Sequence, residues 1–211
     1  RCLSKWCYGS AVRIARVKIE PWDVELPEPF GIATGAQVVA QNVLLEVELA
    51  SGQRGLGEAA PFPAVNGETQ ADALAALDAV ATELVGYAAS DAQQLSEPAR
   101  QRLEATPSAL AALEMALLDA TCRARGTSLF AHFGARTAQL ETDITIPTGD
   151  AEAAARAATR AAGQGFRTLK IKVGGQAFDH DLALLRAIAA AAPQARLLLD
   201  ANASLSAAHA I

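Results

Sequence analysis

Two lysines stand two residues apart in a stretch that otherwise has the character of a buried strand, TLKIKVGG at 168–175. Alternate residues of a strand face the same side, so the ammonium groups of Lys170 and Lys172 would point the same way. Each charge disfavours protonation of the other amine, and partial burial acts in the same direction. One of the two lysines can therefore serve as a general base near neutral pH.

Further polar residues stand at matching places on the neighbouring expected strands. The segment at 195–200 ends in Asp200, Asn202 follows shortly after, and the preceding strand carries Thr145. The carboxyl ends of parallel strands gather at one edge, so we expect these side chains to share one mouth with the lysines. A carboxylate at that place suits a hard divalent cation, which would need further oxygen ligands.

Each of these residues also has a plain structural interpretation. An isolated Lys-x-Lys pair is more often solvated on an edge strand than catalytic. Asp200 could cap the next helix, Asn202 could only form a turn, and Thr145 could be a β-branched strand filler. The aliphatic residues around the lysines, together with the matching acid at the next strand end, favour the catalytic interpretation.

The first half of the chain has the pattern of strands followed by helices. Residues 12–49 contain alternating strand-like runs, and three segments with helical spacing of Leu and Ala follow, at 67–86, 91–105 and 106–126. In the last segment Thr106 is a plausible cap, Pro107 suits the first helical position and Gly126 suits the end. This order predicts an α+β domain with an antiparallel sheet of about three strands.

The second half alternates strand and helix. We expect strands at 142–147, 167–173 and 195–200, with helices at 151–163 and 178–191. The strand centres recur about every 27 residues, the period of a βα unit, which predicts a TIM-type (β/α) barrel. Two and a half units cannot close a barrel of about 250 residues, so we expect a truncated barrel. The open sheet predicts poor solubility and no activity for this piece alone.

These patterns divide the chain into three parts. Residues 1–11 fit nothing downstream and are interpreted as a leader or an artificial extension, 12–135 as an α+β capping domain, and 136–211 as the N-terminal part of the incomplete barrel. Cys122 lies in a helical pattern and is interpreted as a small buried apolar residue.

Composition excludes several classes of protein. Lys and Arg total 18 against 23 Asp and Glu, a formal charge of −5, so no nucleic-acid partner is expected. No apolar run is long enough to predict a membrane partner, and no signal peptide is apparent, so a cytoplasmic location is the default. The sequence leaves a homo-oligomer open.

The segment GLGEAA at 55–60 formally begins like a dinucleotide-binding fingerprint. Pro61 and Pro63 follow at once, where that fingerprint needs the interior of a helix. We therefore interpret these glycines as part of a strand or bulge in the first sheet.

The ordered set of motifs resembles the enolase superfamily, and within it the muconate-lactonising subgroup, which carries Lys-x-Lys on one barrel strand and Asp-x-Asn on the next. PFGIATGAQ, NVLLEVELASG, GLGEAAPF, VNGET and ALEMALLDATCRARG look like the capping domain of that family, and ETDIT, GFRTLKIKVGG and LLLDAN look like its first barrel strands. TDIT and TLKIKVG are most similar to the dipeptide epimerases.

This resemblance implies a Mg²⁺-dependent epimerase that abstracts the α-proton of a small carboxylate substrate, such as a dipeptide, through an enediolate. Lys172 would move the proton on one face, Lys170 and Thr145 would bind substrate, Asp200 would ligate the metal and Asn202 would lie behind that ligand. The opposite-face lysine and two more acidic ligands would lie beyond Ile211. The superfamily's lysine base and Mg²⁺ are a known general example of such chemistry.

One departure from the family pattern bears on the substrate. Members acting on Ala-Glu typically carry an Arg in the capping loop after the Pro-Phe pair, whereas Thr34, Gly35 and Ala36 stand at the matching place here. We assign Thr34 to substrate binding and expect a dipeptide whose second residue is neutral or apolar, because a second carboxylate would be left unpaired.

The sequence is also compatible with other activities. Within the superfamily they are a cycloisomerase, a dehydrating synthase similar to o-succinylbenzoate synthase, and an N-acylamino acid racemase. Outside it they are a Schiff-base aldolase, which also uses a lysine at a strand end, and an inactive fragment.

Overall fold

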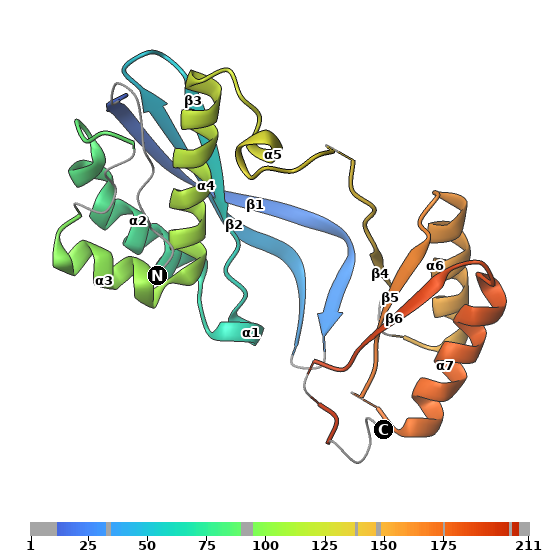
Figure 1. Ribbon diagram of the computed structural model, residues 1–211. Helices are drawn as coiled ribbons and strands as arrows, with labels where there is room; N and C mark the ends of the chain where they lie inside the picture. Colours follow the sequence, from blue (N-terminus) through green and yellow to red (C-terminus); the bar gives the residue numbers. More distant parts are fainter. Residues whose placement is uncertain are drawn as a thin grey trace. The chain divides into compact units, whose positions relative to one another are not determined.

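The computed structural model describes residues 12–32, 35–89, 95–137, 139–146, 149–174, 176–202 and 204–206, and it places side chains outside 28–36. The chain divides into two compact units (Figure 1): the α+β unit, Arg1–Leu26 with Val39–Ala138, and the β/α unit, Pro27–Val38 with Gln139–Ile211. No helix among the described residues is long and apolar enough to cross a membrane.

The first sheet has three strands, in agreement with the prediction. They are β1 (Ile14–Ile32), β2 (Gly35–Leu49) and β3 (Arg54–Ala59), in the order β1-β2-β3. β2 and β3 are antiparallel, with Val43 opposite Ala59. Alternate residues of β2 from Val43 to Leu49 are buried against the helices, because one face of the pleat turns towards the core.

Five helices complete the described part of this unit: α1 (Pro63–Asn66), α2 (Gln70–Leu84), α3 (Glu97–Ala105), α4 (Pro107–Ala124) and α5 (Leu129–His132). The three predicted helices are present, and two begin later than expected. α2 begins after a capping box formed by Thr69 and Asp72, and α3 begins after Ser96, whose side chain accepts a hydrogen bond from the backbone N–H of Ala99.

Helix α4 packs so closely on strand β3 that only glycine fits at two positions of the strand. A Cβ atom added at Gly55 or Gly57 would collide with the backbone of α4 at Ala116 or Ala112. Asp119 of α4 also accepts a hydrogen bond from the backbone N–H of Leu56 at 3.1 Å. The interpretation of GLGEAA as strand is confirmed, and its glycines allow this helix and strand to touch.

The N-terminus of α4 differs from the prediction in one respect. Thr106 is the N-cap residue and Pro107 follows it, but the Thr106 side chain makes no capping hydrogen bond. The buried carboxylate of Glu68 accepts hydrogen bonds from the backbone N–H and the hydroxyl of Ser108 instead. A negative charge from a distant segment therefore satisfies the helix end. Gly126, with φ +63°, follows the helix as expected.

The β/α unit contains a parallel sheet covered on one face by two helices (Figure 1). Its strands are β4 (Ile144–Ile146), β5 (Thr168–Lys172) and β6 (Arg196–Asp200), in that order, and its helices are α6 (Ala151–Gly163) and α7 (Phe178–Ala191). Every predicted strand and helix of this half is present. The last position of the first predicted strand, residue 147, lies outside the described residues.

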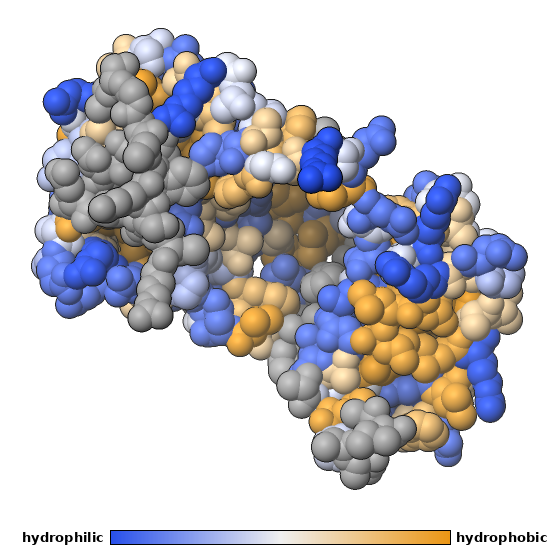
Figure 2. All heavy atoms as spheres, viewed as in Figure 1, coloured by the Kyte–Doolittle hydropathy of each residue, from blue (hydrophilic) through white to orange (hydrophobic). Residues whose placement is uncertain are grey.

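The two faces of the parallel sheet differ in character. Leu169 and Ile171 are fully buried against α6 and α7. The alternate residues face the other way, and in register Thr145 lies beside Lys170 and Lys172 beside Asp200. At the β6 edge Leu198 and Leu199 are exposed, and Figure 2 shows an apolar area over this strand. The residues that could do chemistry thus share the face that the helices leave open.

Candidate active site

Both lysines converge on one carboxylate at the C-terminal edge of the parallel sheet. The Nζ atom of Lys172 lies 2.6 Å from Oδ2 of Asp200, and the Nζ atom of Lys170 lies 3.0 Å from the same oxygen. The parallel register causes this, because it sets Lys172 directly beside Asp200 with Lys170 one pleat behind on the same face. The predicted meeting of the two amines and the acid is therefore present.

The electrostatics of this cluster are unbalanced. Hydrogen bonds from Lys172 and then Lys170, and one from the backbone of Asn202, hold the pKa of the Asp200 carboxyl far below its usual range. Among the described residues, both lysines pair with this one carboxylate. The Lys172 side chain is 10% exposed and that of Lys170 is 30% exposed, so Lys172 has the drier environment. A solvated edge pair does not have this geometry.

Asn202 contacts both ends of the ion pair. Its backbone N–H donates to Oδ1 of Asp200 at 3.0 Å, and its side-chain oxygen accepts a hydrogen bond from Lys172 at 2.7 Å. Its φ of +47° lies in the left-handed region, which Asn adopts more readily than most residues. Asn202 thus forms a turn and also binds the lysine.

The two predicted substrate-binding threonines have different outcomes. Thr145 is half-buried and lies beside Lys170 on the same face of the sheet. Thr34 lies outside the described residues, and its role stays a prediction.

Sequence reasoning missed two residues that fix the loops at this edge. The carboxylate of Asp181, in the first turn of α7, accepts a hydrogen bond from the backbone N–H of Gly174 at 2.7 Å. Gly174 has φ +81°, and a Cβ atom there would collide with the Ser204 hydroxyl in the loop after β6. The available signal was an acid in the first turn of a helix that follows the strand-end glycines.

The residues present supply part of a Mg²⁺ site. The lowered pKa of Asp200 keeps its carboxylate ionised at the edge where the sequence predicts the metal. Carboxylate oxygens are the ligand type that Mg²⁺ prefers. Among the described residues no group of three or more His, Cys, Asp or Glu side chains could hold a metal ion. The donor type fits Mg²⁺, and its other ligands would have to come from elsewhere.

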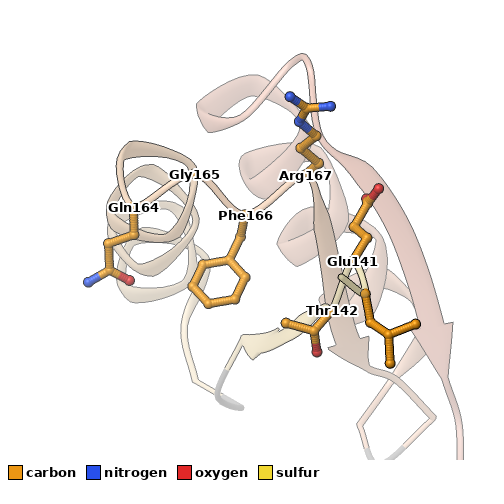
Figure 3. Close-up of a pocket in the computed structure, with 7 residues that line it drawn as sticks. Glu141, Thr142, Gln164, Gly165, Phe166 and Arg167 are labelled. Atoms are coloured by element: carbon orange, nitrogen blue, oxygen red, sulfur yellow. The ribbon is translucent and has the colours of Figure 1, made fainter. Parts of the chain in front are cut away.

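A hollow of about 380 Å³ lies away from these residues, at the N-terminal ends of β4 and β5 (Figure 3). In Figure 3 Phe166 extends from the end of α6 towards Thr142, while Arg167 and Glu141 lie at the rim. Parallel sheets carry their chemistry at the opposite, C-terminal edge. The size of this hollow therefore does not make it the candidate active site.

Family models match both units of the chain. Residues 14–134 match the mandelate racemase / muconate lactonizing enzyme N-terminal domain, and residues 152–211 match the enolase C-terminal domain-like family. The chain belongs to the mandelate racemase / muconate lactonizing enzyme family. The predicted resemblance is confirmed, and so is the predicted fold class, a capping domain followed by the first part of a β/α barrel.

Similar members of this family are dipeptide epimerases. The chain is 43% identical over 189 residues to an aromatic dipeptide epimerase of Herpetosiphon aurantiacus, covering 90% of this chain and 53% of that protein. It is 38% identical over 188 residues to a hydrophobic dipeptide epimerase of Citrifermentans bemidjiense, covering 86% and 50%. The chain thus spans about half the length of the curated relatives it matches.

A solved structure similar to this chain contains Mg and a dipeptide. The dipeptide epimerase of Enterococcus faecalis, complexed with Mg and the dipeptide L-Leu-L-Tyr, is 28% identical to this chain with a TM-score of 0.85, and the match covers 94% of this chain and 56% of that one.

Proposed function

We propose that this chain, extended to the length of its relatives, is a Mg²⁺-dependent epimerase that removes and returns the α-proton of a dipeptide through an enediolate. The observation that carries the proposal is the convergence of Lys170 and Lys172 on Asp200 at the C-terminal edge of the sheet. The family membership of the chain and the names of its relatives support it.

The chemistry needs a base on the α-carbon and positive charge around the substrate carboxylate. In the neutral form Lys172 accepts the proton as the C–H bond breaks, and the bonding pair moves into the carboxylate to give the enediolate. Lys170 binds the substrate carboxylate as its charge grows. A proton from the opposite-face lysine that the family resemblance implies is then delivered to the other face of the same carbon, which completes the epimerisation.

Asp200 is the residue of this chain that would hold the metal. Mg²⁺ bound at Asp200 would supply a Lewis acid that stabilises negative charge on the substrate carboxylate oxygens. A relative's structure contains Mg together with a dipeptide, which supports this assignment. Asn202 keeps Asp200 oriented through its backbone N–H.

The proposed substrate is a dipeptide with a neutral or apolar second residue. No cationic residue stands at Thr34, Gly35 or Ala36 to pair with a second carboxylate. Two relatives are named for aromatic and hydrophobic dipeptides, which supports the same choice.

A dipeptide library assayed in deuterated water with the extended protein tests the function. Epimerisation exchanges the α-proton and yields both stereoisomers without changing the skeleton. Ring formation or dehydration would instead identify a cycloisomerase or a synthase, exchange of N-acylamino acids a racemase, and borohydride trapping of a carbonyl substrate an aldolase. A strong Ala-Glu preference would reject the proposed specificity, and no exchange with any substrate would reject the epimerase.

Other features predicted from the sequence remain proposals. They are the domain ranges 1–11, 12–135 and 136–211, the cytoplasmic location and the lack of nucleic-acid or membrane partners.

A further inference from the structure

We infer that Asn202 is a positioning residue that fixes the direction in which Lys172 exchanges its proton with the substrate. This inference rests on the proposed function. It gives the Asn202 side chain the role of orienting Lys172, in addition to the proton transfer by Lys172 and the binding of metal by Asp200. The observation that supports it is the hydrogen bond from the Nζ atom of Lys172 to the side-chain oxygen of Asn202, at 2.7 Å.

The geometry of the amine gives this contact its meaning. An ammonium nitrogen carries three hydrogens, and on Lys172 two of them point at oxygens, Oδ2 of Asp200 at 2.6 Å and Oδ1 of Asn202 at 2.7 Å. Two acceptors on one nitrogen stop rotation about the Cε–Nζ bond. The third hydrogen is thus held in one direction.

The same two acceptors remain within reach of Lys172 when it gives up a proton. The two remaining N–H groups can keep donating to Asp200 and Asn202, and the lone pair then occupies the third direction. The proton leaves and returns along one line, so the base is aimed before the substrate binds. With Asp200 as the sole acceptor, the lone pair could occupy either of two directions.

Residue 202 acts on the two partners through different atoms. Its backbone N–H binds Asp200 and depends on the left-handed φ of +47°, whereas its side chain binds Lys172. Glycine adopts this backbone without strain, so Asn202→Gly removes the contact to Lys172 and keeps the contact to Asp200. Asn202→Asp keeps an acceptor oxygen for Lys172 and is the conservative variant.

The experiment measures α-proton exchange in deuterated water for each stereoisomer separately, in the extended protein. Lys172→Met first identifies the stereoisomer that Lys172 deprotonates. We expect Asn202→Gly to slow exchange of that stereoisomer roughly 10- to 100-fold, as a base misplaced by about 1 Å would, and to lower kcat more than it raises KM. Exchange of the other stereoisomer should fall much less, and Asn202→Asp should restore the ratio towards the original value.

Equal slowing of both stereoisomers, or an unchanged ratio in Asn202→Gly, would overturn the inference and leave Asn202 as a turn former. A crystal structure of Asn202→Gly gives a readout that needs no activity. The inference expects the Nζ atom of Lys172 to move or to occupy more than one position, while the Asp200 carboxylate keeps its place. If the unsubstituted protein exchanges no α-proton, the proposed function fails, and this structure still decides whether Asn202 positions Lys172.

Discussion

Two strands of this protein carry the same local pattern, two like charges on either side of a buried aliphatic residue. One is EVE at 46–48 in β2 and the other is KIK at 170–172 in β5. The central residues, Val47 and Ile171, are both fully buried. From the strand pattern alone the two segments are equivalent, but their surroundings are very different.

In β2 the charges are matched and solvated. Arg16 and Arg54, from the flanking strands, each lie within 3.7 Å of both Glu46 and Glu48. The two arginine side chains are 55% exposed. Two cations face two anions in water, which is a surface network that adds little to stability.

In β5 the charges are not matched. In the part of the chain that the structure describes, Lys170 and Lys172 both pair with the carboxylate of Asp200 alone, and Lys172 is 10% exposed. Holding two partly desolvated ammonium groups beside one anion is unfavourable, and such arrangements cluster at functional sites. Charge balance and burial therefore distinguish a solvated network of ion pairs from a candidate active site.

The largest effect should come from removing the base on β5. Lys172→Met in the extended protein should lower the epimerisation rate roughly 10²- to 10⁴-fold, because proton transfer to the α-carbon loses its positioned group. The matched change on β2, Glu48→Gln, should leave the rate unchanged. Steady-state kinetics with a hydrophobic dipeptide measure both variants, and an equal loss of rate in the two would show that β5 carries no special role.

The α+β unit should tolerate changes in charge better than changes in volume. Gly57→Ala places a methyl group against the backbone of Ala112 in α4, and it should lower the free energy of unfolding by about 3 kcal/mol through overpacking. Gly52→Ala, where space is open but φ is +88°, should cost about 1 kcal/mol. Urea denaturation measures both, and equal losses would show that α4 moves aside.

The loops at the edge of the β/α unit should also depend on close packing. Gly174→Ala would place a methyl group against the Ser204 hydroxyl. We expect a clear loss of epimerisation rate in the extended protein, with only a small drop in its melting temperature. Gly165→Ala has a similar positive φ, +94°, but open space around it at the other end of β5, so it controls for backbone strain of about 1 kcal/mol. Kinetics and thermal melts are compared, and an equal loss of rate in both variants would contradict the role given to Gly174.

The smallest effect should come from the charges on β2. The hydrogen bond from Arg16 lowers the pKa of Glu48, so this pair contributes above the ordinary carboxyl pKa and its contribution is lost as pH falls. Arg16→Ala should therefore differ slightly from the unsubstituted protein at pH 7 and low salt, and the difference should shrink at acid pH or in 1 M salt. Urea midpoints check this, and a difference that persists in salt would indicate lost packing of the arginine stem.

Local patterns predicted most of the elements, because the periodicity of apolar residues follows burial. Both sheets and the main helices lie where that periodicity places them. The N-terminus of α4 was predicted incompletely. Its residue Ser108 donates a hydrogen bond to Glu68, which lies 40 residues earlier in the chain, and no local motif indicates such a contact. The contact between Asp181 and Gly174 was missed for a similar reason, because it depends on the path of the loop.

The alternation along each strand, and with it the shared face of Lys170, Lys172 and Asp200, follows from the sequence because side-chain direction in a strand depends on position in the chain. The folded chain is needed to know that both amines reach one carboxylate oxygen and that Asn202 binds Lys172, the less exposed of the two lysines. Those distances depend on the register between strands and on a left-handed turn, and neither is encoded in the spacing of residues within one segment.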